Sequence, residues 1–165
     1  MHAKSFDPKV IDGDQRFVKN FSDGLVWHRT GHRTLYADTD RSAMVYHANY
    51  LRYFELGRAT LMRDMGCPYT EIEADGYVYP IIETGIKYHF PLYYDEPMWI
   101  NTRPGELGKA RVKFCYIITN AETGAVVCSG FTEHCALNSS GKPVRIDEKT
   151  KRLWQIYPSA ERRQA

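Results

Sequence analysis

Apolar residues recur at helical spacing over residues 50–65. Tyr50, Phe54, Gly57, Leu61 and Met65 follow one another at steps of four, three, four and four. Those steps place all five on one face of a helix, while the charged residues between them fall on the other faces. The pattern therefore predicts one long amphipathic helix whose apolar stripe packs on the rest of the domain.

The ends of this helix are marked by residue type. Asn49 is a favoured N-cap residue, and Gly66 and Pro68 end the pattern. A glycine in mid-helix, here Gly57, costs about 1 kcal/mol relative to alanine. We therefore expect another element, such as a sheet that wraps around the helix, to approach Gly57 closely.

Much of the remaining chain is rich in β-branched and aromatic residues, in runs bounded by turn residues. These runs predict strands at residues 25–36, 77–90, 97–102, 111–119 and 125–137. Residues 120–124 suit a hairpin loop, and residues 149–156 suit a short terminal helix. One strand, one long helix and several antiparallel strands in that order indicate an α+β fold.

The first 24 residues differ from the rest because they are polar and carry Asp-Gly turn signals. We expect residues 1–24 to form an irregular N-terminal extension that packs on the domain without joining its core. Residues 25–165 are then expected to form a single domain, which suits a chain of 165 residues.

Composition excludes several classes of protein. A formal net charge of +2 argues against a nucleic-acid partner, which would call for a basic stripe. No apolar run approaches the roughly 20 residues of a membrane helix, and the N-terminus lacks a signal-peptide core. We therefore expect a cytoplasmic protein with no membrane partner. The four cysteines have no metal-ligand spacing and are expected to be reduced, partly buried thiols.

Two carboxylates lie between the first predicted strand and the helix. Asp38 and Asp40 fall in a short turn, and Tyr46, His47 and Asn49 follow at the expected helix start. The first N–H groups of a helix have no partner within it, and they lie at its positive end. Such groups can hold a carbonyl oxygen that gains negative charge while a nearby carboxylate reacts.

This segment resembles the signature of the hotdog-fold acyl-CoA thioesterases of the 4-hydroxybenzoyl-CoA thioesterase type. Their pattern has an aromatic residue, Asp-x-Asp, a loop of small residues, an apolar–aromatic step and Asn-Tyr at the helix start. It is matched here by Tyr36, Asp38, Asp40, Val45, Tyr46, His47, Asn49, Tyr50, Phe54 and Glu55. The resemblance continues more weakly to Ile146. Ala43 departs from it, because family loops often have glycine just before the apolar–aromatic step.

The resemblance implies a hotdog fold, in which an antiparallel sheet wraps around one long central helix. It also implies a homodimer or homotetramer with active sites shared between protomers, and a reaction that needs no metal or other cofactor. The implied activity is hydrolysis of an acyl-CoA thioester to a free acid and coenzyme A. An acyl-carrier-protein thioesterase and a non-catalytic acyl-CoA binding module are the alternatives, and the acyl group itself is left open.

The same resemblance assigns roles to single residues. Asp40 occupies the place of the catalytic aspartate, as nucleophile or general base, and Asp38 is expected to brace the loop. His47 either assists at the reacting carbonyl or only forms hydrogen bonds at the helix start. Glu55 is a competing carboxylate, but its spacing of three from Arg52 and Arg58 favours ordinary ion pairs along the helix.

The expected substrate contacts surround the helix start. They come from Met44, Tyr46, Asn49 and Tyr50, with a main-chain N–H of Tyr46, His47 or a neighbour as the donor to the thioester oxygen. Met44 is also compatible with a place in the core.

Overall fold

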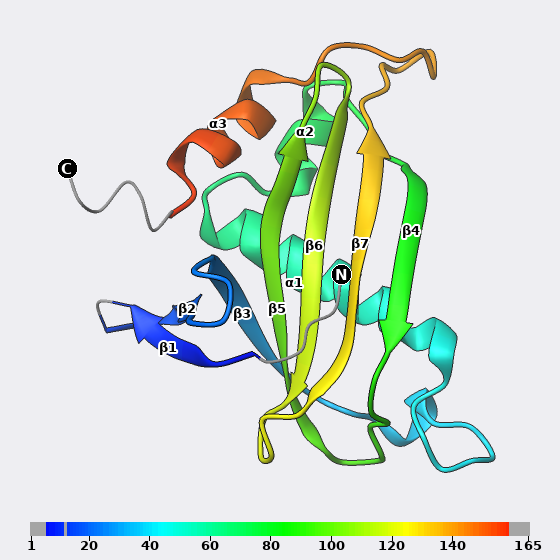
Figure 1. Cartoon of the computed structure of the whole chain (residues 1–165). Helices are drawn as coiled ribbons and strands as arrows, with labels where there is room; N and C mark the ends of the chain where they lie inside the picture. Colours follow the sequence, from blue (N-terminus) through cyan, green and yellow to red (C-terminus); the bar gives the residue numbers. More distant parts are fainter. Residues whose placement is uncertain (1–5, 12, 159–165) are drawn as a thin grey trace.

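One antiparallel sheet of seven strands forms the body of the protein (Figure 1). The computed structural model describes residues 6–11 and 13–158. The strand order across the sheet is β1-β2-β3-β5-β6-β7-β4. The strands are β1 (Pro8–Ile11), β2 (Asp14–Asn20), β3 (Val26–Arg33), β4 (Ile81–Tyr88), β5 (Pro97–Leu107), β6 (Arg111–Asn120) and β7 (Val126–Cys135).

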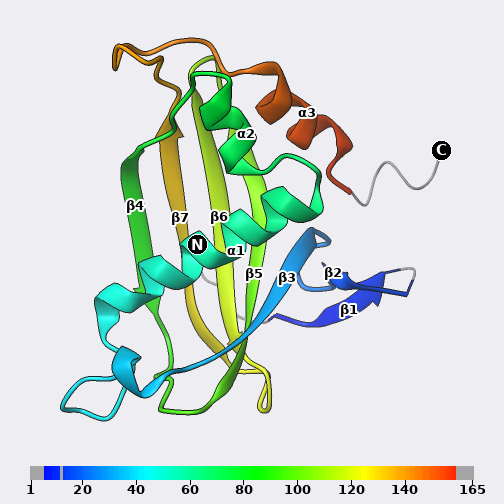
Figure 2. The same cartoon turned by 180° about the vertical axis from the view of Figure 1, so that it is seen from behind.

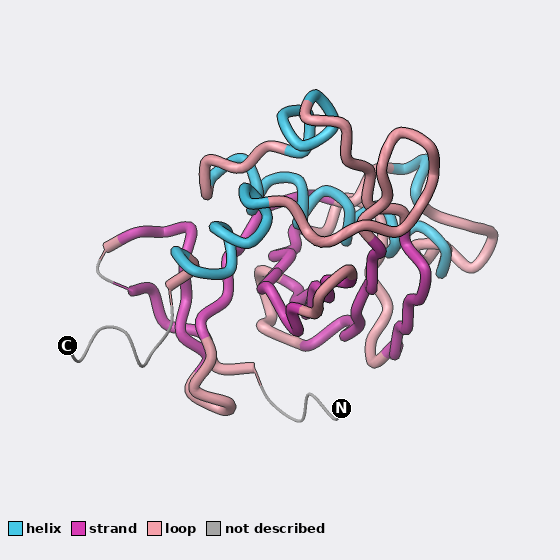
Figure 3. The backbone as a smooth tube through the Cα atoms, turned by 90° about the horizontal axis from the view of Figure 1, so that it is seen from above, coloured by secondary structure: helices cyan, strands magenta, loops and turns pink. Residues whose placement is uncertain are grey.

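The helices lie on one side of this sheet. Helix α1 (Tyr50–Asp64) crosses the strands, and the shorter helices α2 (Tyr69–Ala74) and α3 (Glu148–Ile156) lie near one end of it (Figure 2). The view from above shows the helices gathered over one face, with the curved sheet below them (Figure 3). Two 3₁₀ turns, Tyr36–Asp38 and His47–Asn49, lie between β3 and α1. The arrangement confirms the expected α+β hotdog fold.

The predicted apolar stripe of α1 forms the centre of the core. Tyr50, Phe54, Gly57 and Leu61 are buried, and Met65 is partly buried at the end of the helix. The ring of Phe54 stacks on Tyr116 of β6, with 4.2 Å between the centroids. Burial of such large apolar side chains is the main favourable term in folding, so the stripe fixes which face of α1 meets the sheet.

The close approach of β5 to α1 explains why position 57 is a glycine. A Cβ atom at this position would lie 2.5 Å from Oγ1 of Thr102 and 2.6 Å from Cγ2 of Ile100. Both side chains are fully buried in the central strand. The expected close approach to the helix is therefore real, and it is made by two β-branched side chains of the sheet.

We expect Gly57→Ala to lower the free energy of unfolding by about 1–3 kcal/mol, although alanine is the better helix former, because the added methyl group overpacks a rigid site. Urea denaturation measures the effect. Arg63→Ala, on the exposed side of the same helix, is the control and should change stability by less than about 0.5 kcal/mol. A Gly57→Ala variant as stable as wild type would show that the side chains of β5 shift enough to accommodate the added methyl group.

The N-terminal segment corrects the sequence prediction of irregular structure. It forms β1 and β2, and β2 pairs with β3 through contacts such as Phe17 opposite His28. Val18 of β2 packs with Trp27 and Cys115 on the sheet face opposite α1, in a second, smaller apolar cluster. The division into an extension and a domain at residue 25 remains a prediction.

Other predicted elements differ in extent. The strand expected over residues 77–90 is confined to β4, and β5 continues five residues beyond the expected end at Thr102. Helix α2 was not predicted, because its six residues carry too little periodicity. No helix in residues 6–11 and 13–158 combines the length and apolar character needed to cross a membrane.

Candidate active site

The loop between β3 and α1 is held in a fixed shape by main-chain hydrogen bonds. Isolated antiparallel bridges join Thr39 to Val45 and Met44 to Tyr93. The N–H of Asp40 donates to the carbonyl of Met44 over 2.9 Å, which closes a tight turn over residues 40–44. Both predicted carboxylates therefore occupy defined positions before the helix begins.

Asp38 braces this loop, as expected. Its side chain is buried, and Oδ2 accepts hydrogen bonds from the Tyr53 hydroxyl at 2.7 Å and the Leu35 N–H at 3.0 Å. Burial, and then the bond to Asp38, raises the pKa of Tyr53, so this phenol stays protonated and donates. The guanidinium of Arg52 lies 3.9 Å from Oδ1 but is largely exposed, which makes it a weak partner.

Asp40 is exposed at the turn. Its Oδ1 accepts a hydrogen bond from the Ser42 N–H at 2.7 Å, which is the usual contact of an aspartate at the start of a turn. Within the described residues, Oδ2 accepts no hydrogen bond. One oxygen thus orients the carboxylate, while the other is available to water or to a substrate.

Ala43 adopts a left-handed backbone conformation, with φ of +61°. This is the position at which the related loops often have glycine, and a side chain there is strained. Alanine at position 43 still forms the turn, but its left-handed conformation lowers the stability of the fold relative to glycine.

We expect Ala43→Gly to raise the free energy of unfolding by roughly 0.5–1 kcal/mol, since the relief of strain exceeds the extra entropy that glycine gives the unfolded chain. Urea denaturation measures the gain. Ala37→Gly, in the same motif but outside the left-handed region, is the matched control and should lose stability. Equal shifts in both variants would show that the strain at Ala43 is negligible.

The helix start differs in part from expectation. The N–H of Tyr46 donates to the carbonyl of Asp38 over 2.8 Å, so this N–H is already engaged. Asn49 is the N-cap residue of α1, as predicted, but its side chain donates to the same carbonyl over 2.8 Å and makes no capping bond. The first internal bond of the turn runs from the Asn49 N–H to Tyr46, which leaves the N–H groups of His47 and Ala48 as the candidate donors.

A cavity of about 280 Å³ opens beside the helix start. Three predicted site residues line it: Met44, His47 and Tyr50. The opposite wall was missed by sequence reasoning and consists of Tyr88, His89, Phe90 and Pro91. The Tyr88 hydroxyl donates to the carbonyl of His47 over 2.8 Å, which ties the end of β4 to the helix start. Asp40, Tyr46 and Asn49 are not among the lining residues.

Comparison with known protein families decides the class. Residues 35–153, which include the loop, α1 and β4–β7, match the Thioesterase-like superfamily. The chain belongs to this superfamily. The expected class, a thioester hydrolase, is thereby confirmed, and the N-terminal strands β1 to β3 lie outside the matched region.

Curated relatives of this thioesterase-like protein carry related names. YneP of Bacillus subtilis, provisionally named an acyl-CoA thioesterase, is 32% identical over 127 residues, which are 77% of this chain and 92% of YneP. The 1,4-dihydroxy-2-naphthoyl-CoA hydrolase of Thermosynechococcus vestitus is 30% identical over 67% of this chain and 74% of its own length.

Solved structures agree with the sequence relatives. The DHNA-CoA thioesterase of Staphylococcus aureus superimposes with a TM-score of 0.73 at 26% identity, over 84% of this chain and 91% of that chain. A hypothetical protein from Aquifex aeolicus gives a TM-score of 0.72 at 28% identity, over 76% and 97%.

Glu55, the competing carboxylate of this superfamily member, does not form the expected ion pairs. Among the described residues, Arg52 contacts Asp38, and Arg58 donates to the Tyr116 hydroxyl over 3.0 Å. Glu55 is exposed and lines a second cavity of about 160 Å³, between α1, α2 and the sheet. The ion pairs that helix spacing predicted for Glu55 are therefore absent among the described residues.

A chain of hydrogen bonds runs from Arg58 to His134 beside this second cavity. The Tyr116 hydroxyl accepts from Arg58 and lies 2.7 Å from Oγ1 of Thr132, which in turn lies 2.8 Å from Nε2 of His134. Nδ1 of His134 lies 2.9 Å from the carbonyl of Tyr79, which only accepts. Nδ1 therefore carries a proton, and in the neutral form of the imidazole Nε2 accepts from Thr132. Burial, and then the charge of Arg58, lowers the pKa of His134 to about 4.

The cysteines and the acidic groups form no metal centre in the part of the chain that the structure describes. All four cysteines are free thiols, and three of them are buried, as expected. No three His, Cys, Asp or Glu side chains within residues 6–11 and 13–158 are close enough together to hold a metal ion.

Proposed function

We propose that this protein hydrolyses an acyl-CoA thioester to a free acid and coenzyme A at the cavity beside the helix start, which Met44 of the Asp40 turn lines. The observation that carries the proposal is an exposed, oriented carboxylate in a turn that leads directly into the unpaired N–H groups of a helix. The names of the relatives from Bacillus subtilis and Staphylococcus aureus support coenzyme A as the carrier. Placement with the 4-hydroxybenzoyl-CoA thioesterase type rests on the motif alone.

In this mechanism the thioester oxygen lies against the N–H groups of His47 and Ala48. As general base, Asp40 takes a proton from a water molecule whose oxygen bonds to the carbonyl carbon, the C–S bond breaks, and the thiolate leaves and is protonated. As nucleophile, Asp40 bonds to that carbon and the C–S bond breaks, which releases the coenzyme A thiolate and leaves a mixed anhydride; water then hydrolyses the anhydride to the free acid and restores the Asp40 carboxylate. A single turnover in ¹⁸O-labelled water distinguishes them, because only the anhydride route can place label in the Asp40 carboxylate.

The walls of the cavity favour a flat acyl group. Tyr50, Tyr88 and Phe90 surround it, with Met44 as an adaptable apolar neighbour. His47 lines the cavity and is exposed, so its ring can orient a water molecule. Tyr46 and Asn49 do not line the cavity; their hydrogen bonds to the carbonyl of Asp38 hold the loop against the helix start.

We further propose that a second copy completes the site. Strand β4 is the outer strand of the sheet, and large apolar side chains are exposed along it and beyond it: Ile81, Ile82, Tyr88, Phe90 and Tyr93. An exposed apolar edge of this kind is normally covered in a soluble protein. Pairing through β4 gives a homodimer, and two such dimers a homotetramer. Light scattering tests this, and a monomer at micromolar concentration would contradict it.

The function is tested by release of free thiol from a panel of benzoyl-CoA, hexanoyl-CoA, palmitoyl-CoA and a hexanoyl acyl-carrier protein. We expect turnover on the CoA esters, fastest for benzoyl-CoA. Turnover only on the carrier protein would favour the acyl-carrier-protein thioesterase. Binding of acyl-CoA that stays intact for hours would favour the non-catalytic module.

A further inference from the structure

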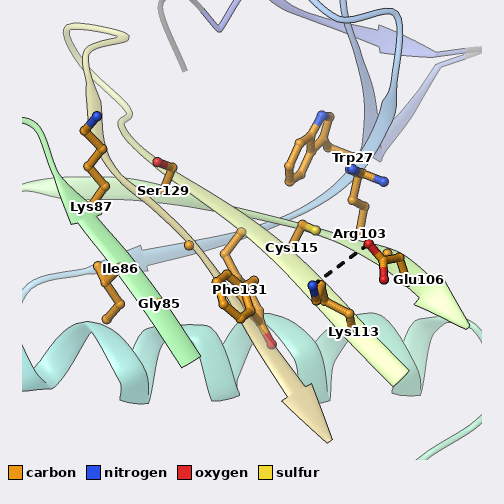
Figure 4. A pocket seen from close by; sticks show the side chains of 13 residues that line it. Trp27, Gly85, Ile86, Lys87, Arg103, Glu106, Lys113, Cys115, Ser129 and Phe131 are labelled. Carbon is orange, nitrogen blue, oxygen red and sulfur yellow. Dashed lines mark ion pairs between the residues drawn. The ribbon is translucent and has the colours of Figure 1, made fainter. Parts of the chain in front are cut away.

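The face of the sheet opposite α1 carries a cavity of about 530 Å³. It lies away from the Asp40 site and is formed by five strands. One row of residues crosses β4, β7, β6 and β5 in register: Gly85, Phe131, Cys115 and Arg103. Trp27 of β3 closes one end, and Lys87 lies at the other (Figure 4). We call this cavity the outer groove.

The outer groove depends on the N-terminal strands. Trp27 is 2% exposed and packs with Val18 of β2 and Cys115 of β6, so the indole stands as a wall where these strands meet the main sheet. Residues before position 35 lie outside the region matched to the superfamily. The wall is therefore contributed by a part of this chain that the superfamily match does not include.

Two buried donors at this end have no partner within the described residues. They are Nε1 of Trp27 and Nε of Arg103. The Arg103 guanidinium lies 5.2 Å from the centre of the Trp27 ring, so the two groups form one unit. Because both nitrogens are closed to solvent, they are also closed to a ligand in the groove, and the stacked indole and guanidinium act as a solid end wall.

The charge of the outer groove is positive. Arg103 and Lys113 line it, and Glu106 is the one acidic residue in the lining. Glu106 contacts Lys113 at 3.9 Å, but its side chain is 85% exposed, which makes this a weak pair. Glu133, opposite Lys113 in register, faces Arg111 at 4.0 Å. A net positive groove disfavours a symmetric contact with a second copy, which would bring two such faces together.

The floor between the charged groups is apolar and flat. The ring of Phe131 lies across Gly85, where a Cβ atom would come within 2.6 Å of it. Lys113 lies 4.8 Å from the centre of the same ring. The volume of the groove is in the range of small-molecule sites, which are mostly apolar with a few placed polar groups.

From the charge, the volume and the apolar floor we infer that the outer groove binds an organic anion with a flat apolar body, its carboxylate attracted by the positive charges of Arg103 and Lys113. Charge-assisted hydrogen bonds are the stronger ones in proteins, and the ring of Phe131 supplies a stacking surface for the apolar body. The site is separate from the hydrolytic centre and does not require it to be active.

The test uses 2-naphthoate as the probe and the indole N–H signal of Trp27 as the reporter. The chain has three tryptophans, so an ¹H–¹⁵N spectrum of the full protein resolves three indole signals, and Trp27→Phe assigns the relevant one. We expect 2-naphthoate to shift the Trp27 signal saturably and to leave Trp99 unchanged. Neutral 2-naphthamide should bind at least tenfold more weakly.

Charge removal provides the matched variants. Arg103→Gln with Lys113→Gln should weaken binding at least tenfold, while Arg152→Gln, an exposed arginine on α3, should leave it unchanged. If the double variant loses its spectral dispersion, Lys113→Gln alone, at a partly exposed site, should still weaken binding several-fold. Equal affinity in all variants would overturn the inference. So would an equal response to inorganic phosphate, or a change of oligomeric state in the double variant without any binding of 2-naphthoate.

Discussion

Asp40→Asn should lower the rate of acyl-CoA hydrolysis by at least 10²-fold. Asparagine keeps the oxygen that accepts from the Ser42 N–H, so the turn should survive, but it has no charge with which to attack carbon or to take a proton. A positioned general base contributes about 10²–10⁴-fold. The measurement is kcat from free-thiol release, with urea denaturation to show that the fold is unchanged.

Asp38→Asn is the matched control, because it makes the same chemical change two residues away. Asp38 is buried and accepts from Tyr53 and Leu35, so its loss of charge should reduce stability by about 1–2 kcal/mol and activity by less than tenfold. The two substitutions should thus differ in effect: Asp40→Asn mainly lowers activity, and Asp38→Asn mainly lowers stability. An Asp40→Asn enzyme that retains its turnover would move the chemistry to Glu55 or His47.

Acid should destabilise this protein through His134. Its pKa falls from an ordinary 6.5 to about 4 in the folded state, so between these pH values the unfolded chain binds more protons. Protonation then favours unfolding, and stability is lost as the pH falls from about 6.5 to 4. One pKa unit corresponds to 1.36 kcal/mol, so the loss from this residue amounts to about 3 kcal/mol.

Urea denaturation at several pH values measures this loss, with His134→Gln as the comparison. Glutamine can still donate to the Tyr79 carbonyl and accept from Thr132, but it does not titrate. Burial also lowers the pKa of His28, whose Nε2 lies 2.7 Å from Asp64, so the wild-type slope includes both histidines. The difference between the two proteins isolates His134. Parallel stability curves would show that the buried imidazole is already charged or freely hydrated.

Local pattern was sufficient to predict α1, the face of α1 that packs on the sheet, and the position of the loop that carries Asp38 and Asp40. The helix prediction was reliable because the helical spacing from Tyr50 to Leu61, the glycine at position 57 and the helix-ending residues all indicate the same element. The role of Asp38 as a brace also followed from residue type and place. The left-handed backbone of Ala43 is consistent with the glycine that the related loops often have at this position.

Features that depend on distant residues were not predictable in this way. The far wall of the cavity comes from Tyr88 and Phe90, some 40 positions beyond the helix start, and only strand pairing brings them there. Strand β2 is polar in sequence and becomes a strand through its pairing with β3. Glu55 lost its expected partners because Asp38 and Tyr116, from elsewhere in the fold, contact the two arginines.

The two borders of the sheet are unequal, and this limits how many chains can join through them. Strand β4 offers eight residues for pairing, whereas β1 offers four, includes Pro8, which has no N–H, and changes register at Val10. In the proposed dimer, pairing of β4 with a second β4 would join two chains and leave the short β1 strand at each outer edge. The N-terminal strands would then favour a closed assembly of fixed size over an open ribbon of indefinite length.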